Sequence, residues 1–352
     1  MHMFRLLRAL VFLPLVWSAS AMSASPIIIA HRGASAERPE HTLMAYRLAI
    51  AEGADFIEPD LVSTRDGQLV ARHENEIGST TDVASRPEFA ARKTRKTIEG
   101  TEVTGWFTED FTLSELKTLK ARERLPQLRP GNARFDGMEG IPTFEEVLRL
   151  ARDAGKARGR PIGVYPETKH PSYFRSIGLP LEEALLKSLA AHDLNQRESP
   201  VFIQSFEVGN LRRLRAKTSV RLVQLMASDG GPADQPGSTY AEMARPAGLK
   251  AIASYADAIG VEKAMLFPRQ ADGLPGAPTS LVADAHKAGL SVHVWTFRPE
   301  NYFLPPDMRK GTDPAARGDA VKEIKAFMAI GIDGIFSDSV VDAVAAKAEV
   351  DP

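Results

Sequence analysis

The chain has 352 residues, of which 43% are hydrophobic and 25% charged, and its formal net charge is −1. These values are typical of one large globular domain or two small ones, and they give no support for nucleic-acid binding. The chain has no cysteine, which excludes disulfides, zinc–thiolate sites and cysteine nucleophiles.

The N-terminus has the pattern of a secretory signal peptide. Arg5 and Arg8 precede an apolar run, Ala9–Trp17, and Ala19-Ser20-Ala21 follows as a small-x-small cleavage site. The apolar run is shorter than the roughly 20 residues that a membrane-spanning helix needs. We therefore expect residues 1–21 to be removed on export to the periplasm or the outside of the cell, and we expect no stable membrane insertion.

Short apolar runs alternate with amphipathic helical stretches in the rest of the chain. Eight runs have strand character: Ile27–Ala30, Asp55–Leu61, Ile162–Tyr165, Val201–Ser205, Leu222–Met226, Ala256–Gly260, Ser291–Phe297 and Gly334–Ser337. Helical patterns separate most of them, as at Thr42–Glu52, Phe144–Ala154, Leu181–His192, Glu207–Arg215, Ser280–Ala288 and Ala320–Ile330. Repeated β–α units predict parallel strands, and eight of them predict a (β/α)8 TIM barrel, here over residues 26–345.

A ninth strand-like run, Gln68–His73, follows the second strand too closely for a parallel crossover. Asp66-Gly67 is a strong hairpin signal, so this run should fold back antiparallel. With those two residues at the centre of the turn, Asp60 would pair with His73. The stretch that follows has few barrel-like patterns, and we expect a small insertion subdomain over about residues 64–140.

Several predicted strands end in polar groups, and the carboxyl ends of barrel strands carry active sites. Glu58 and Asp60 are two residues apart and should share a face of their strand. Glu167 ends the next barrel strand and can approach them. Three carboxylates without a thiolate form an oxygen site that suits Ca²⁺ or Mg²⁺ better than Zn²⁺.

The same strand ends supply groups for phosphodiester hydrolysis. His31 and His73 flank the predicted metal site and can serve as acid and base. Arg32 and Lys169 can bind the phosphate oxygens. Each signal is weak alone, because strand-end histidines and Glu–Lys pairs are often structural; their joint position favours a catalytic site.

These residues also resemble a known family, the glycerophosphodiester phosphodiesterases, and most closely its periplasmic bacterial branch. The resemblance rests on segments in a fixed order: Ala30-His31-Arg32-Gly33-Ala34-Ser35, Arg38-Pro39-Glu40-His41-Thr42, Gly53–Leu61, Thr64–His73, Tyr165-Pro166-Glu167-Thr168-Lys169, Val294-Trp295-Thr296 and Gly331–Asp338. Two positions depart from the family pattern: Glu74 follows the second histidine in place of Asp, and Ser337-Asp338 replaces Thr-Asp.

The resemblance implies a barrel with an insertion after the second strand, and hydrolysis of glycerophosphodiesters to sn-glycerol 3-phosphate and an alcohol such as choline or ethanolamine. It implies His31 and His73 as the acid/base pair, and Arg32 as a phosphate contact. It implies Glu58, Asp60 and Glu167 as ligands of one divalent cation, Ca²⁺ in the periplasmic branch and Mg²⁺ in others. The expected partner is a small-molecule substrate; the oligomeric state is not predicted.

Other residues are weaker candidates. Trp295 either packs against the glycerol carbons or belongs to the core, and Gln204 is a candidate hydrogen-bond donor to substrate. Glu40 is expected to order the first loop, and His41 has no convergent partner in the predicted elements. Two alternative functions remain open: a related barrel phosphodiesterase acting on lysophospholipid or sphingolipid, and a non-catalytic glycerophosphodiester-binding protein.

Overall fold

The computed structural model describes residues 25–350, and its centre is a closed barrel of parallel strands. The barrel strands are β1 (Ile27–His31), β2 (Phe56–Glu58) continued by β3 (Asp60–Ser63), β7 (Gly163–Val164) continued by β8 (Glu167–Thr168), β9 (Phe202–Ser205), β10 (Arg221–Met226), β11 (Ala258–Glu262), β12 (Ser291–Phe297) and β13 (Gly334–Ser337). β1 pairs with β2 on one side and with β13 on the other, so the ring closes. The predicted barrel is confirmed, and the predicted signal peptide lies outside the described residues.

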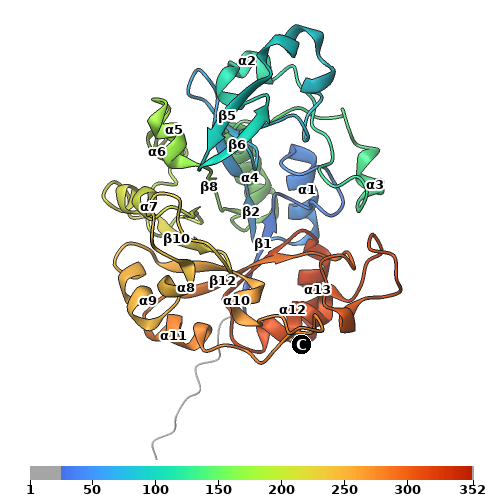
Figure 1. The fold of residues 1–352 in the computed structure, drawn as a ribbon, viewed down its shortest axis with the longest axis vertical. Coiled ribbons are helices and arrows are strands. Elements are labelled where there is room, and N and C mark those ends of the chain that lie inside the picture. The colour runs from blue at the N-terminus through green and yellow to red at the C-terminus, as the bar shows by residue number, and fades with distance from the viewer. Residues whose placement is uncertain (1–24, 351–352) are drawn as a thin grey trace, which may run out of the picture.

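Helices follow the strands around the barrel (Figure 1). They are α1 (Leu43–Glu52), α4 (Phe144–Arg158), α5 (Pro171–Ser176), α6 (Leu181–Ala191), α7 (Val208–Arg215), α8 (Tyr240–Met243), α9 (Pro246–Ile252), α10 (Lys263–Leu266), α11 (Leu281–Lys287), α12 (Ala320–Met328) and α13 (Val340–Val350). A short 3₁₀ helix, η4 (Pro306–Met308), precedes α12. Apolar side chains of the strands and helices form one large core between the two layers.

The barrel interior has its own small core. Ile29, Phe56, Tyr165, Phe202 and Phe336 belong to it, and Tyr165 forms a hydrogen bond of 2.6 Å with His293, joining Oη to Nδ1. This plug of mostly aromatic side chains fills the barrel below its carboxyl-terminal end. The polar residues that follow it in the strands therefore pack directly above this buried cluster.

The hairpin after the second strand differs from its predicted register by one residue. β4 (Leu69–Ala71) is antiparallel to β3, as predicted, but Leu61 pairs with Ala71. The turn contains three residues rather than two, because Gly67 adopts a φ of 73° and Thr64 N donates to Gln68 O at 2.9 Å. Consequently Arg72, and not His73, lies opposite Asp60.

The long segment after β4 contains a separate two-stranded antiparallel sheet, β5 (Thr94–Ile98) and β6 (Thr101–Gly105). Its short helices are η1 (Val83–Ser85), η2 (Pro87–Arg92), η3 (Thr108–Asp110), α2 (Leu113–Leu116) and α3 (Pro130–Ala133). α2 begins with a capping box at Thr112 and Glu115. In Figure 1, α2, β5 and β6 lie at the top of the view, opposite α11 and α12.

Candidate active site

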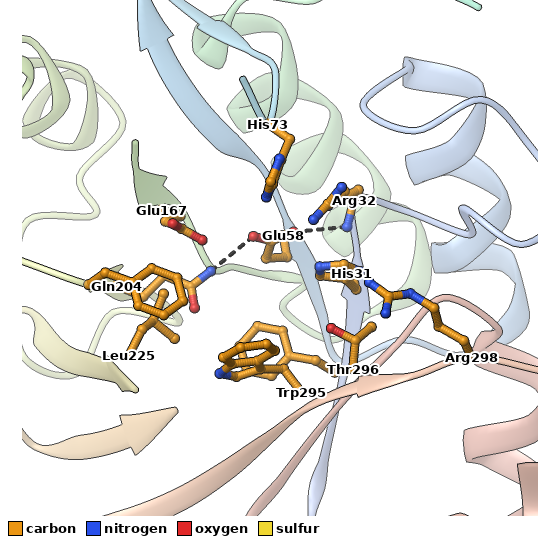
Figure 2. A pocket seen from close by; sticks show the side chains of 12 residues that line it. His31, Arg32, Glu58, His73, Glu167, Gln204, Leu225, Trp295, Thr296 and Arg298 are labelled. Atoms are coloured by element: carbon orange, nitrogen blue, oxygen red, sulfur yellow. Dashed lines mark hydrogen bonds between the residues drawn. The ribbon is translucent and has the colours of Figure 1, made fainter. Parts of the chain in front are cut away.

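The register of the barrel places the predicted site residues side by side at the carboxyl ends of neighbouring strands. His31 pairs with Glu58 between β1 and β2. Asp60 pairs with Glu167 between β3 and β8, and Glu167 pairs with Gln204 between β8 and β9. Residues far apart in the sequence therefore meet around one point, as Figure 2 shows for most of them.

The carboxylates of Glu58, Asp60 and Glu167 converge on that point. Each offers an oxygen atom, and the three oxygens lie within 4.8 Å of one another. Burial, with repulsion from Asp60 and Glu167, raises the pKa of Glu58 well above its ordinary value. Burial likewise raises the pKa of Glu167 to about 8, against the attraction of Lys169.

Asp60 differs from the other two acids. Burial acts to raise its pKa, but a hydrogen bond from His41 and nearby positive charges hold the pKa of Asp60 well below its ordinary value. Its second oxygen, Oδ1, is buried and has no hydrogen-bond partner among the described residues. An unpartnered buried carboxylate oxygen beside two further carboxylates fits a hard divalent cation, since only a cation or protons would relieve their repulsion.

Neighbouring groups fix the orientation of these carboxylates. The backbone N–H of Arg32 donates to Glu58 at 2.8 Å, and the amide of Gln204 donates to its other oxygen at 2.9 Å; both bonds are drawn in Figure 2. His41 Nε2 lies 2.8 Å from Asp60, and Lys169 Nζ lies 2.9 Å from Glu167. Such outer contacts set the geometry and the affinity of a metal site.

His31 is held by the last barrel strand. Its Nδ1 lies 2.6 Å from Asp338, the residue directly after β13. The carboxylate keeps the Nδ1 proton in place, and therefore leaves Nε2 as the nitrogen available to a substrate. Burial lowers the pKa of His31 to about 4, with the Arg32 charge acting in the same direction.

His73 reaches the same cavity by another route. The chain leaves β4 after Ala71, so the ring enters from a loop rather than from the strand face that the predicted register required. His73 Nδ1 lies 2.5 Å from Glu74, and its Nε2 lies 3.3 Å from Lys169 Nζ. Burial lowers the pKa of His73 to about 3, helped by the charges of Arg32 and Lys169.

The two imidazoles border a cavity of about 90 Å³. His31, Arg32, Glu58, His73, Glu167, Gln204, Phe206, Leu225, Trp295, Thr296, Arg298 and Phe336 line it. Trp295 forms part of its floor and donates its indole N–H to Gly260 O at 3.1 Å. Gln204 reaches the cavity too, but its amide is already engaged with Glu58. Lys169 lies beside the cavity rather than in its wall.

Several residues at the site were missed or misjudged from the sequence. The expectation that His41 lacks a partner was wrong: it bridges Asp60 and Tyr46, with 2.8 Å to each. Asp338 was identified only as part of Ser337-Asp338, which departs from the family motif, and its contact with His31 was not predicted. Arg298 lines the cavity and donates to Asp338 at 3.1 Å, but it follows β12 without a distinguishing pattern.

Comparison with known proteins agrees with this geometry. The sequence profile described as "Glycerophosphoryl diester phosphodiesterase family" matches residues 31–342. The chain belongs to this family. Glycerophosphodiester phosphodiesterase GDPD6 of Arabidopsis thaliana is 36% identical over 90% of the chain and 84% of its own length. A glycerophosphodiester phosphodiesterase of Haemophilus influenzae is 30% identical over 79% and 80% of the two chains. The protein is thus an enzyme, a glycerophosphodiester phosphodiesterase.

Solved structures of the family share the fold. A putative family member from Silicibacter pomeroyi superposes with a TM-score of 0.65 at 21% identity, covering 93% of this chain and 95% of that one. An Oleispira antarctica phosphodiesterase, solved with the product sn-glycerol-3-phosphate, gives 0.60 at 19% identity, covering 93% and 97%. Among residues 25–350, no helix is both long and apolar enough to cross a bilayer.

Proposed function

We propose that this enzyme cleaves glycerophosphodiesters to sn-glycerol 3-phosphate and an alcohol, using His31 and His73 as its acid/base pair. The observation that carries the proposal is that both imidazoles line one cavity together with Glu58 and Glu167. The Oleispira antarctica phosphodiesterase, whose structure contains sn-glycerol-3-phosphate, supports the choice of product.

Glu58, Asp60 and Glu167 would hold the divalent cation. When bound, the cation neutralises phosphoryl oxygens and lowers the cost of charge that builds up during the reaction. Arg32 is positioned to bind phosphate, because its guanidinium lines the cavity while Glu40 holds Nη1 at 3.0 Å. Arg298 brings a second guanidinium to the cavity, next to His31 (Figure 2).

The two histidines are arranged to move protons. Their lowered pKa values, about 4 and 3, make both imidazoles neutral at pH 7 before substrate binds. A phosphodiester anion beside them favours the charged form and raises both values. One imidazole then takes a proton from the attacking oxygen, and the other donates one to the departing alkoxide.

Alanine replacement tests the pair. His31→Ala and His73→Ala should each lower kcat for glycerophosphocholine by at least about a hundredfold, the usual contribution of general acid–base catalysis. His286→Ala is the matched control, because His286 lies at the surface against Asp333. Circular dichroism should show all three variants folded. Near-normal turnover in either of the first two would reject the assignment.

The attacking oxygen belongs either to water or to the neighbouring glycerol hydroxyl. The second route passes through a cyclic glycerol phosphate, which ³¹P NMR distinguishes from the open monoester. The same assay with lysophosphatidylcholine tests the alternative lipid substrate.

We also propose Ca²⁺ as the favoured cation and export as the fate of the chain. Three carboxylates suit Ca²⁺, and Mg²⁺ remains compatible with the same ligands. Activity should be lost in chelator. The ion that restores more of it, when Ca²⁺ and Mg²⁺ are added separately, is the favoured metal. The motif at residues 1–21 supports export; cell fractionation of the full chain and of a variant lacking these residues tests it.

A further inference from the structure

A second cavity, of about 250 Å³, adjoins the catalytic one. Glu167 and Phe206 line both cavities. The second cavity is several times the volume of a water molecule in the liquid, about 30 Å³. An ester arm of a substrate with its phosphate between His31 and His73 would enter this space by passing Phe206.

The wall of this second cavity contains a buried acid without a counter-charge. Glu207 is 1% exposed and lines the cavity. Its carboxylate accepts hydrogen bonds only from the backbone N–H and hydroxyl of Ser172, and no cationic side chain among residues 25–350 forms a salt bridge with it. Buried carboxylates are ordinarily paired with a cation. Burial raises the pKa of Glu207 to about 7, as expected of an acid that lacks one.

Two cationic side chains also line the cavity, but acids already neutralise them. Lys169 Nζ lies 2.9 Å from Glu167. His170 lies between Glu99, at 2.7 Å, and Glu74, at 3.5 Å. Glu99 lines the cavity as well. The charge left over in the wall is therefore negative.

Aromatic rings connect the two cavities. Tyr240, in the second cavity, packs edge-on against Phe206 with ring centroids 6.1 Å apart. Phe206 packs edge-on against Trp295, in the catalytic cavity, at 5.8 Å. Aromatic faces bind quaternary and primary ammonium groups through the negative charge of the ring face.

We propose that this second cavity is the subsite for the leaving alcohol and that it selects positively charged alcohols, those that carry an ammonium or a quaternary ammonium group. Glu207 supplies the uncompensated negative charge, and Phe206 and Tyr240 supply the aromatic walls. The proposal rests on the proposed hydrolysis, and it adds a preference among glycerophosphodiesters. Glycerol itself then occupies the side of His31 and Trp295.

The test compares two substrates that differ in the charge of the alcohol. Glycerophosphocholine carries a quaternary ammonium, and glycerophosphoglycerol has a neutral alcohol of similar length. Glu207→Gln should lower the ratio of kcat/KM for the first over the second by about tenfold, the size of one desolvated cation contact. Glu102→Gln is the matched control, because Glu102 is an exposed acid on β6, outside both cavities; it should leave the ratio unchanged.

A second measurement does not depend on any variant. Choline and 3,3-dimethylbutan-1-ol have the same shape, and only choline is charged. Choline should inhibit the wild-type enzyme about tenfold more strongly. Equal inhibition by the two alcohols would overturn the proposal. So would an equal fall in kcat/KM for both substrates in Glu207→Gln. Failure of the wild-type enzyme to cleave either diester would instead count against the proposed function.

Discussion

Arg129, from the segment between β4 and α4, lies 2.6 Å from Asp338 at the end of the last barrel strand. The other oxygen of Asp338 lies 2.6 Å from His31 Nδ1. Arg129 also binds Glu300, at 2.6 Å. The segment between β4 and α4 therefore contacts His31 indirectly, through the carboxylate of Asp338 that Arg129 and His31 share.

Replacement of Arg129 by Gln should change the acidity of His31 as well as the stability of the fold. Burial opposes the charged form of Asp338, but Arg129 and Arg298 hold the pKa of Asp338 well below its ordinary value. Without Arg129 the carboxylate attracts the imidazolium more strongly, so the pKa of His31 rises. The limb of the pH–rate profile that His31 governs should move to higher pH.

The melting temperature of the Arg129→Gln variant should also fall, because breaking a buried pair costs about 3–5 kcal/mol. Arg134→Gln, in the same segment, serves as control. A purely structural role of Arg129 would lower the melting temperature and leave the pH profile of the folded fraction in place.

His41 should matter for metal affinity although it does not touch the metal site directly. Its ring orients Asp60 from the side opposite the unpartnered Oδ1. His41→Gln should weaken Ca²⁺ binding by about ten- to a hundredfold, as loss of an outer partner usually does. Isothermal titration calorimetry measures this constant. His192→Gln, which removes a partly buried contact with Glu145 outside the site, should bind Ca²⁺ as the wild type does.

The metal-free enzyme should lose stability as the pH rises from about 7 to 8. Burial raises the pKa of Glu167 to about 8 in the folded state, above the value of about 4.3 for a free glutamate. Between these two values Glu167 binds more proton in the folded state than in the unfolded state, so its contribution to the free energy of unfolding falls with pH. The lowered pKa values of His31 and His73 act in the opposite direction below about pH 6.5, so the decline is expected above that pH.

Melting curves in chelator at several pH values should show this decline. Saturating Ca²⁺ should flatten it, because the cation replaces the protons. Glu167→Gln should make the decline smaller without any metal, and the raised pKa of Glu58 accounts for the part that remains. A melting temperature that rises over this range in chelator would contradict the prediction.

Gly33 should tolerate no side chain. It has a φ of 89°, and a Cβ there would lie 2.7 Å from the backbone of Ala45. Gly33→Ala therefore combines backbone strain with a clash and should cost about 3 kcal/mol or more. Gly67→Ala is the control: φ is 73° but the surrounding space is open, so strain alone should cost about 1–2 kcal/mol. Urea denaturation measures both.

Much of the barrel was predictable, because each strand is a short apolar run bounded by polar residues, and the closure of eight parallel strands leaves little freedom in their order. The site followed from the same rule, since Glu58, Asp60 and Glu167 sit where their strands end. The carboxylates also met as predicted.

The errors arose where local geometry depends on one backbone angle or on a distant partner. The hairpin register differs by one residue from the prediction because the turn contains Arg65 as well as Asp66 and Gly67, with Gly67 at a positive φ in its third position. His73 still entered the cavity, since the strand had already ended at Ala71. His41 and Asp338 acquire their partners only through the tertiary fold, and neither lies in a sequence pattern that names the partner.

The site is assembled from both ends of the described chain. β13 closes the ring against β1, and Asp338 follows β13 directly. A chain truncated before residue 334 has neither the closing strand nor the carboxylate that orients His31. We therefore expect such a truncated chain to have no activity even where its other strands fold.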